Sequence, residues 1–171
     1  MKQKDTNLIL WKECKDVFLS ASNQKLRELL CEVLEIVKKN YGFFHKIADL
    51  NFLDYVIKID ANDYLIGTTG DDFELRVKEF AKQDAISDEF IWVILSQLIW
   101  DLILPTTDRI CPFCHCDNLT LLMDEKRERI YESCENCLWL SENDKQVMRL
   151  DNLLPASKDM IAQYELKKKL Y

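Results

Sequence analysis

The sequence predicts a mainly α fold: a helical N-terminal domain (residues 1–105), a small β-hairpin module (106–145) and a C-terminal helical segment (146–171), α+β overall. Apolar residues recur at helical spacing through most of the first hundred positions. Two Cys-X-X-Cys pairs enclose two short strand-like runs between Cys111 and Cys137. Only three Gly and three Pro occur in 171 residues, which argues against a loop-rich chain.

The first two helices are expected at residues 7–21 and 23–39. The first stretch reads as an amphipathic helix, although residues 8–11 also fit a short strand; its apolar positions are Leu8, Leu10, Trp11, Val17, Phe18 and Leu19. Ser22 is placed as the N-cap of the second helix. Cys31, between its apolar and polar faces, is expected to be a small packing residue.

The middle of the N-terminal domain is less regular in pattern. Residues 43–55 have a helical period, whereas 56–66 also alternate as a strand would; we favour helix for both. The GTTG run at 67–70 is expected to be a turn, because it lacks the lysine of a phosphate-binding loop.

Two further helices complete this domain. Asp71 and Glu74 predict a capping box for a helix over 72–81, and Ser87 is expected to cap a helix over 88–104. The latter is apolar nearly all round, with Gln97 and Asp101 as a narrow polar stripe, which predicts that it forms the core of the domain.

The hairpin module is expected to contain strands at 119–123 and 128–132, joined by a turn at 124–127. A third strand is predicted at 138–140, with Leu138 and Leu140 on one face and Trp139 on the other. Ser157 is expected to cap a final helix that runs to residue 170.

The cysteine spacing predicts a metal site. Nineteen residues separate the pair Cys111/Cys114 from the pair Cys134/Cys137, a separation typical of a four-thiolate zinc site. Four thiolates complete the tetrahedron of one Zn²⁺, so the ion is expected to be structural, with no open position for catalysis. Cys116 or His115 could replace Cys114, and Cys116 could act as a redox thiol, but we favour both as flanking residues.

Residues 109–141 resemble the zinc-ribbon family, in which a β-hairpin carries a metal knuckle at each end and a third strand sometimes follows. Cys111-Pro112-Phe113-Cys114 matches the family's first knuckle, whereas His115 and Leu138 stand where the family commonly has glycine. The resemblance implies a fold and a metal only, because ribbons bind nucleic acid in some proteins, bind proteins in others and elsewhere brace a fold.

Composition and charge indicate the cellular compartment of the protein and the classes of partner that it binds. Seven cysteines, an odd number, and a start without a secretory signal predict a cytoplasmic protein. The most apolar run, 90–104, is too short for a bilayer, so no membrane association is expected. The net charge is −7, spread over both halves, and it lacks the basic field of most nucleic-acid binders. No catalytic set involves His45 or His115, and we expect no enzyme.

The favoured function is a zinc-stabilised protein-binding module with a basic partner. Its make-up resembles in type the bacterial immunity proteins, which neutralise a secreted toxin, often a basic nuclease. Exposed acids are the candidate contacts: Asp71, Asp72, Glu74, Asp88 and Glu89.

Two alternatives remain. In the first, the ribbon contacts nucleic acid through Lys126, Arg127 and Arg129 at the hairpin tip, although interleaved glutamates cancel most of that field. In the second, the ribbon only stabilises an enzyme or regulatory domain.

Overall fold

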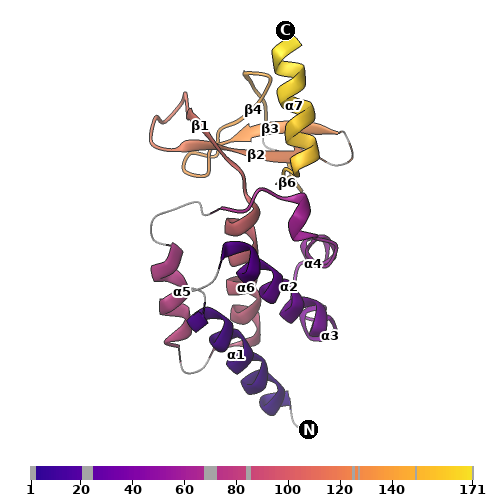
Figure 1. The fold of residues 1–171 in the computed structure, drawn as a ribbon, viewed down its shortest axis with the longest axis vertical. Helices are drawn as coiled ribbons and strands as arrows, with labels where there is room; N and C mark the ends of the chain where they lie inside the picture. The colour runs from indigo at the N-terminus through magenta and orange to yellow at the C-terminus, as the bar shows by residue number, and fades with distance from the viewer. Residues whose placement is uncertain are drawn as a thin grey trace. The chain divides into compact units, whose positions relative to one another are not determined.

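The computed structural model describes residues 3–20, 25–67, 73–83, 86–124, 126, 128–148 and 150–170, with the backbone alone at 3–7, 74 and 167–170. The chain forms two compact units (Figure 1). Unit 1 comprises Met1–Ala61 and Thr68–Leu102, and unit 2 comprises Asn62–Gly67 and Ile103–Tyr171. The predicted division at residues 105 and 145 stays a prediction.

Unit 1 is helical throughout its regular elements. They are α1 (Gln3–Ser20), α2 (Leu26–Lys39), α3 (Tyr41–Phe44), α4 (Leu50–Val56), α5 (Phe73–Ala81) and α6 (Asp88–Ile103), whose last residue already belongs to unit 2. The first helix is therefore confirmed, and the strand alternative for 8–11 is wrong.

Helix α6 supplies much of the core of unit 1, as its composition predicts. Its buried apolar residues lie on more than one face: Ile91, Trp92, Ile94, Leu95, Leu98, Ile99 and Leu102. Ser87 caps its start, because the Ser87 Oγ accepts from the Phe90 N–H at 3.2 Å. The predicted polar stripe is wrong at Asp101, which is buried and pairs with Arg76 at 2.9 Å.

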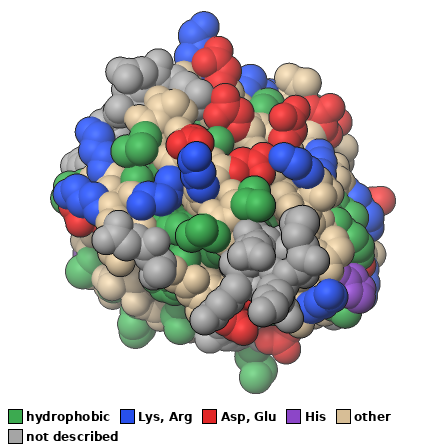
Figure 2. Space-filling view, turned by 90° about the horizontal axis from the view of Figure 1, so that it is seen from below, with side chains coloured by type: hydrophobic (Ala, Val, Ile, Leu, Met, Phe, Trp, Pro, Cys, Tyr) green, Lys and Arg blue, Asp and Glu red, His purple; other side chains and the backbone are tan. Residues whose placement is uncertain are grey.

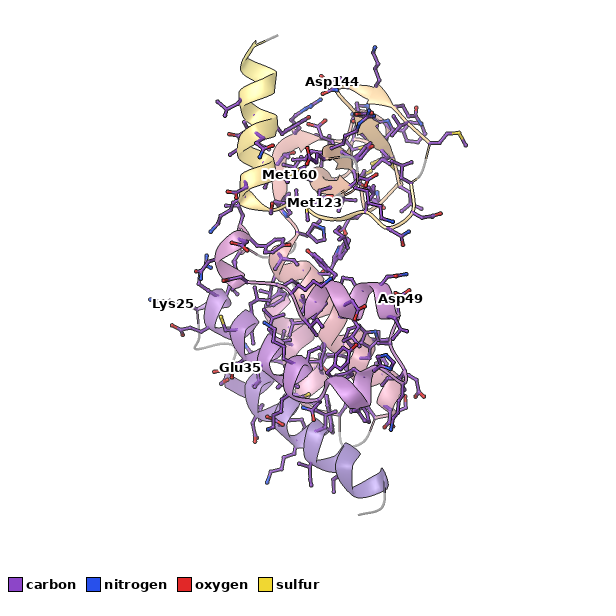
Figure 3. All side chains as sticks on the ribbon, turned by 90° about the vertical axis from the view of Figure 1, so that its right-hand side faces the viewer. Lys25, Glu35, Asp49, Met123, Asp144 and Met160 are labelled. Atoms are coloured by element: carbon purple, nitrogen blue, oxygen red, sulfur yellow. The ribbon has the colours of Figure 1, made fainter. Side chains whose placement is uncertain are left out.

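The predicted helix over 43–55 is interrupted, and the predicted helix over 56–66 is absent. Asp49 (labelled in Figure 3) starts α4 afresh, since its carboxylate accepts from the N–H groups of Asn51 and Phe52 at 2.8 and 3.1 Å. Residues 57–58 form a turn, 59–60 have no regular structure, and a short 3₁₀ helix, η2 (Ala61–Asp63), follows. Arg27 and Lys38 of α2 donate to the carbonyls of Ala61 and Ile59. These donors satisfy backbone groups that a helix would pair internally.

Besides Asp101, three side chains of unit 1 differ from expectation. Leu8 and Leu19 are exposed on α1, whose buried residues among positions 8–20 are Leu10, Trp11, Cys14 and Phe18. Cys31 is exposed as well. Helix α2 begins at Leu26 with Lys25 as its N-cap residue, so the predicted start at residue 23 with Ser22 as N-cap is wrong. Ser22, Asn23, residues 68–70 and Asp71 lie outside the described residues, so the capping box that involves Asp71 and most of the turn over 67–70 stay predictions.

Unit 2 shows that the mainly α prediction is wrong, because it contains an antiparallel sheet of six strands among its described residues. The strands are β1 (Thr106–Ile110), β2 (Asn118–Asp124), β3 (Arg129–Ser133), β4 (Leu140–Glu142), β5 (Lys145–Gln146) and β6 (Leu154–Pro155). Their order is β1-β2-β3-β4-β5, and β6 pairs with β2 beyond Thr106, the first residue of β1. The fold is therefore a mixture of helices and sheet.

The central hairpin is confirmed, and the third strand is shifted. Strands β2 and β3 pair from Thr120↔Ser133 to Asp124↔Arg129. Strand β4 begins only at Leu140, because Leu138 has a φ of 59° and cannot continue an extended strand. A two-residue turn joins β4 to β5, with both Asn143 and Asp144 at positive φ, as a type I′ hairpin requires.

The C-terminal helix α7 (Lys158–Leu170) lies beside this sheet (Figure 1). Ser157 caps it as predicted: its Oγ accepts from the Met160 N–H at 3.4 Å. The Tyr164 hydroxyl donates to Glu132 of β3 at 3.4 Å, and the Lys158 ammonium donates to the carbonyl of Asn62 at 2.7 Å. Both contacts lie within unit 2.

Candidate metal centre

The two Cys-X-X-Cys pairs lie at one end of the β2–β3 hairpin. Cys111 and Cys114 precede β2, and Cys134 and Cys137 follow β3. Antiparallel pairing sets the beginning of β2 beside the end of β3, so the hairpin brings together two pairs that are distant in sequence.

The four sulfur atoms form one cluster. All lie within 4.8 Å of one another, and Cys111–Cys137 and Cys114–Cys134 are each separated by 3.6 Å between Sγ atoms. Four sulfurs about 2.3 Å from a tetrahedral ion would be roughly 3.8 Å apart, whereas a disulfide would hold two of them about 2.05 Å apart. The cluster therefore fits four thiolates around a single metal ion.

The backbone of the two pairs repeats one pattern. The N–H that follows the second cysteine donates to the carbonyl of the first, from His115 to Cys111 at 3.1 Å and from Leu138 to Cys134 at 2.9 Å. His115 and Leu138 both take the left-handed conformation, with φ of 55° and 59°. These are the two positions where zinc ribbons commonly have glycine. The knuckle conformation is thus kept although the residues that favour it are absent.

Backbone N–H groups also point at the sulfurs. A hydrogen bond from the Cys116 N–H is the main cause that lowers the pKa of the Cys114 thiol to about 6. Burial raises the pKa of Cys134 to about 12, and burial likewise raises that of Cys137, against donation from the N–H of Trp139. A cation at the centre would favour the thiolate form at all four positions, because its charge offsets the burial of theirs.

Burial divides the four cysteines of the cluster into an inner and an outer pair. Cys111 and Cys134 are fully buried with Leu119, and the half-buried Cys114, Cys137 and Trp139 pack against this cluster. One half of the site is thereby built into the apolar interior of unit 2.

The alternative ligands of the first pair lie outside the cluster. His115 and Cys116 are exposed, and the Cys116 thiol donates to the carbonyl of Cys114 at 3.1 Å. The four sulfurs that meet belong to the favoured set, Cys111, Cys114, Cys134 and Cys137. No second group of His, Cys, Asp or Glu able to hold a metal ion occurs among the described side chains.

The other predicted contact residues are not gathered into a site by any described interaction. Glu89 is exposed and Asp88 half-buried at the start of α6, while Asp71, Asp72 and the Glu74 side chain lie outside the described part. At the hairpin tip, Lys126 is exposed, Arg127 is not described, and Arg129 pairs with Glu142 at 3.1 Å.

Sequence reasoning missed a charged network on the sheet. Arg109 of β1 donates to both carboxylate oxygens of the buried Glu132, at 2.6 and 2.7 Å. It also donates to Asp144 at 2.7 Å (labelled in Figure 3). The side-chain hydrogen bond to Asp144 is the main cause that raises the pKa of Arg109. The network joins β1, β3 and the β4–β5 turn, and no local pattern in the sequence identifies it.

Comparison with protein-family models, curated proteins and solved structures finds no match to this chain. Within the described residues, no helix combines the length and the apolar character needed to cross a bilayer.

Proposed function

We propose that the chain is a protein-binding module stabilised by one structural Zn²⁺ that Cys111, Cys114, Cys134 and Cys137 hold. The observation that carries the proposal is the closed set of four sulfurs within 4.8 Å. Four thiolates complete a tetrahedral site, so the ion has no position for water or substrate and serves to hold the hairpin ends together. The hairpin, with one Cys-X-X-Cys pair before β2 and the other after β3, supports a ribbon-like module.

The identity of the metal is tested by elemental analysis of the purified protein. We expect one zinc per chain in the wild type, one in Cys116→Ser and none in Cys134→Ser. Cys116→Ser is the matched control, since its sulfur is exposed and outside the cluster. Iron in place of zinc, or a metal-free wild type, would contradict the proposal.

Protein binding is favoured over metal-dependent catalysis because the cysteine cluster is a closed site and no second group able to hold a metal ion occurs among the described side chains. The net charge of −7 suits a basic partner. In Figure 2, acidic, basic and hydrophobic side chains interleave on the face shown, with no single-sign field. An inhibitor of the immunity type is the form we propose.

Nucleic-acid binding is the less favoured candidate. Of the basic residues at the hairpin tip, Arg129 is already engaged by Glu142. A phosphate contact at this position would have to compete with that ion pair.

The function is tested by capture on the immobilised, zinc-loaded protein. Native lysate is passed over it with and without nuclease treatment, and the retained proteins are identified. We expect one basic protein in both lysates, released by high salt because screening weakens charge complementarity. Retention that disappears after nuclease treatment would instead support the nucleic-acid candidate, and retention of no protein would refute the protein-binding function.

A further inference from the structure

We infer that the partner docks on the metal end of unit 2, and that it presents a cationic protein segment with an apolar side chain. The metal end is defined as residues 108–117 and 134–139. The inference rests on the proposed protein-binding function and adds the place and the chemistry of the contact.

The metal end carries exposed apolar side chains at unusual positions. Ile110, Phe113 and Leu138 are 61%, 70% and 59% exposed, and each is the immediate chain neighbour of a cysteine of the cluster. Consecutive Cα atoms are about 3.8 Å apart, so the compact sulfur cluster holds all three residues in one region. Large exposed apolar groups gathered in one region are typical of interaction surfaces.

These three residues are also held in place before any partner arrives. Leu138 donates its N–H to Cys134, and Phe113 lies in the turn closed by the hydrogen bond from His115 to Cys111. Residues on such a fixed backbone lose little backbone freedom on binding, so less of the affinity of an apolar anchor is lost to ordering.

The charge of the metal end selects the kind of partner. Asp108, Asp117 and Glu135 are exposed, whereas Arg109, the one Lys or Arg in these segments, is engaged by Glu132 and Asp144. A Zn²⁺ with four thiolates adds a net charge of about −2. This surface attracts cations and repels the phosphates of nucleic acids and of anionic lipid surfaces. A cationic protein segment with an apolar anchor complements both of its properties.

The test begins with a displayed library of short random peptides, selected on the zinc-loaded protein. The most enriched peptide is synthesised and titrated against three proteins. The first is the wild type, and the second is Phe113→Ser/Leu138→Asn, where asparagine tolerates the left-handed backbone. The third is the control Met148→Ser/Leu166→Ser, which removes two exposed apolar side chains elsewhere in unit 2. Zinc content and thermal unfolding are measured on each.

We expect enriched peptides that combine Lys or Arg with an aromatic or aliphatic residue. Their Kd should rise about tenfold or more in the metal-end variant, as for a central anchor, should stay unchanged in the control, and should rise with salt.

Other results would overturn the inference. Acidic peptides, equal binding by the wild type and the metal-end variant, or a library that yields no peptide above the background of that variant would each do so. The proposed function is judged separately, because a partner captured from lysate equally by the metal-end variant would leave protein binding intact and place it on another surface.

Discussion

The seven cysteines occupy three environments although they share one chemistry. Four form the sulfur cluster, Cys14 is fully buried on α1, and Cys31 and Cys116 are exposed. Burial is the main cause that raises the pKa of Cys14 to about 12, so this thiol stays neutral at any pH at which the protein is ordinarily handled.

Alkylation of the native, zinc-loaded protein should distinguish these environments. At about pH 8, iodoacetamide should modify Cys31 and Cys116 and leave the other five thiols intact, because only a reachable thiolate reacts. Peptide mass spectrometry gives the site of each adduct. After chelation in denaturant all seven should react. Rapid modification of Cys111 or Cys134 in the zinc-loaded protein would refute the metal cluster.

The burial of Cys14 also makes the stability of the fold depend on pH. Because the folded pKa lies above the unfolded value of 9.0, the contribution of this neutral thiol to stability is present below about pH 9. It is lost as pH rises from there toward 12.

His115 and Leu138 store backbone strain that glycine would relieve. A left-handed conformation costs a residue with a side chain about 1–2 kcal/mol. Glycine avoids this cost, but its greater freedom in the unfolded chain offsets part of the gain in stability. His115→Gly and Leu138→Gly should therefore each raise the free energy of unfolding by about 0.5–1 kcal/mol. Urea unfolding at a constant concentration of free zinc measures this change in the free energy of unfolding. Glu135→Gly, exposed in the second knuckle and without a positive φ, should be neutral or destabilising.

At the residue scale the sequence predicted which cysteines cluster better than it predicted the burial of other side chains. Cysteine spacing is a local signal, and it was sufficient to find four sulfurs that meet. The exposure of Cys31 and the burial of Asp101 could not be predicted, because each depends on which helices pack around it.

At the scale of elements, the β2–β3 hairpin is tied to its neighbours by charge as well as by backbone pairing. Arg109 joins β1 to the buried Glu132 of β3 and to Asp144 in the β4–β5 turn. The carboxylate of Glu132 thus depends on a cation that another strand supplies.

Removing the Arg109 guanidinium should lower the free energy of unfolding more than removing the charge of its exposed partner Asp144. Arg109→Met leaves the buried Glu132 carboxylate without this guanidinium and should lower the free energy of unfolding by about 2 kcal/mol, below the range for a fully buried pair because Arg109 is partly exposed. Asp144→Asn, at an exposed end of the network, should cost less than about 1 kcal/mol. Chemical denaturation of both variants at equal zinc provides the comparison. Equal losses would refute the dominant role of Glu132.

The elements that the sequence missed are the short ones. Strands β5 and β6 have two residues each, and β1 is a polar strand, Thr-Thr-Asp-Arg-Ile, at the edge of the sheet. Such segments form because a neighbouring strand offers hydrogen-bonding partners. They therefore need no alternating hydrophobic pattern by which the sequence would predict them. The Asn143-Asp144 pair was the usable local signal, since both residue types tolerate the positive φ of a type I′ turn.

At the scale of the whole molecule, the two units have separate sources of stability. Unit 1 has an apolar core built on α6, whereas the sulfur cluster belongs to unit 2. A metal ion held by the cluster would therefore contribute to the folding of unit 2 directly.

Zinc removal should open unit 2 selectively. In chelator, amide hydrogen exchange should accelerate across the strands β1–β6, while α2 and α6 of unit 1 keep most of their protection. Cys134→Ser should reproduce this pattern without chelator, and Cys116→Ser should not. Uniform loss of protection in both units would show that the two units unfold as one.

The chain enters unit 2 at Asn62–Gly67, returns to unit 1, and enters unit 2 again at Ile103. The segments of unit 2 therefore come together in a different order from their order along the chain. Asn62 accepts a hydrogen bond from Lys158, 96 positions later. The ends of that loop must meet late, whereas the thiols of 111–137 lie close enough in sequence to meet early. During synthesis, residues 62–67 leave the ribosome long before the strands they accompany. A fragment that starts at Ile103 would hold every sulfur of the cluster and still lack a piece of its own unit.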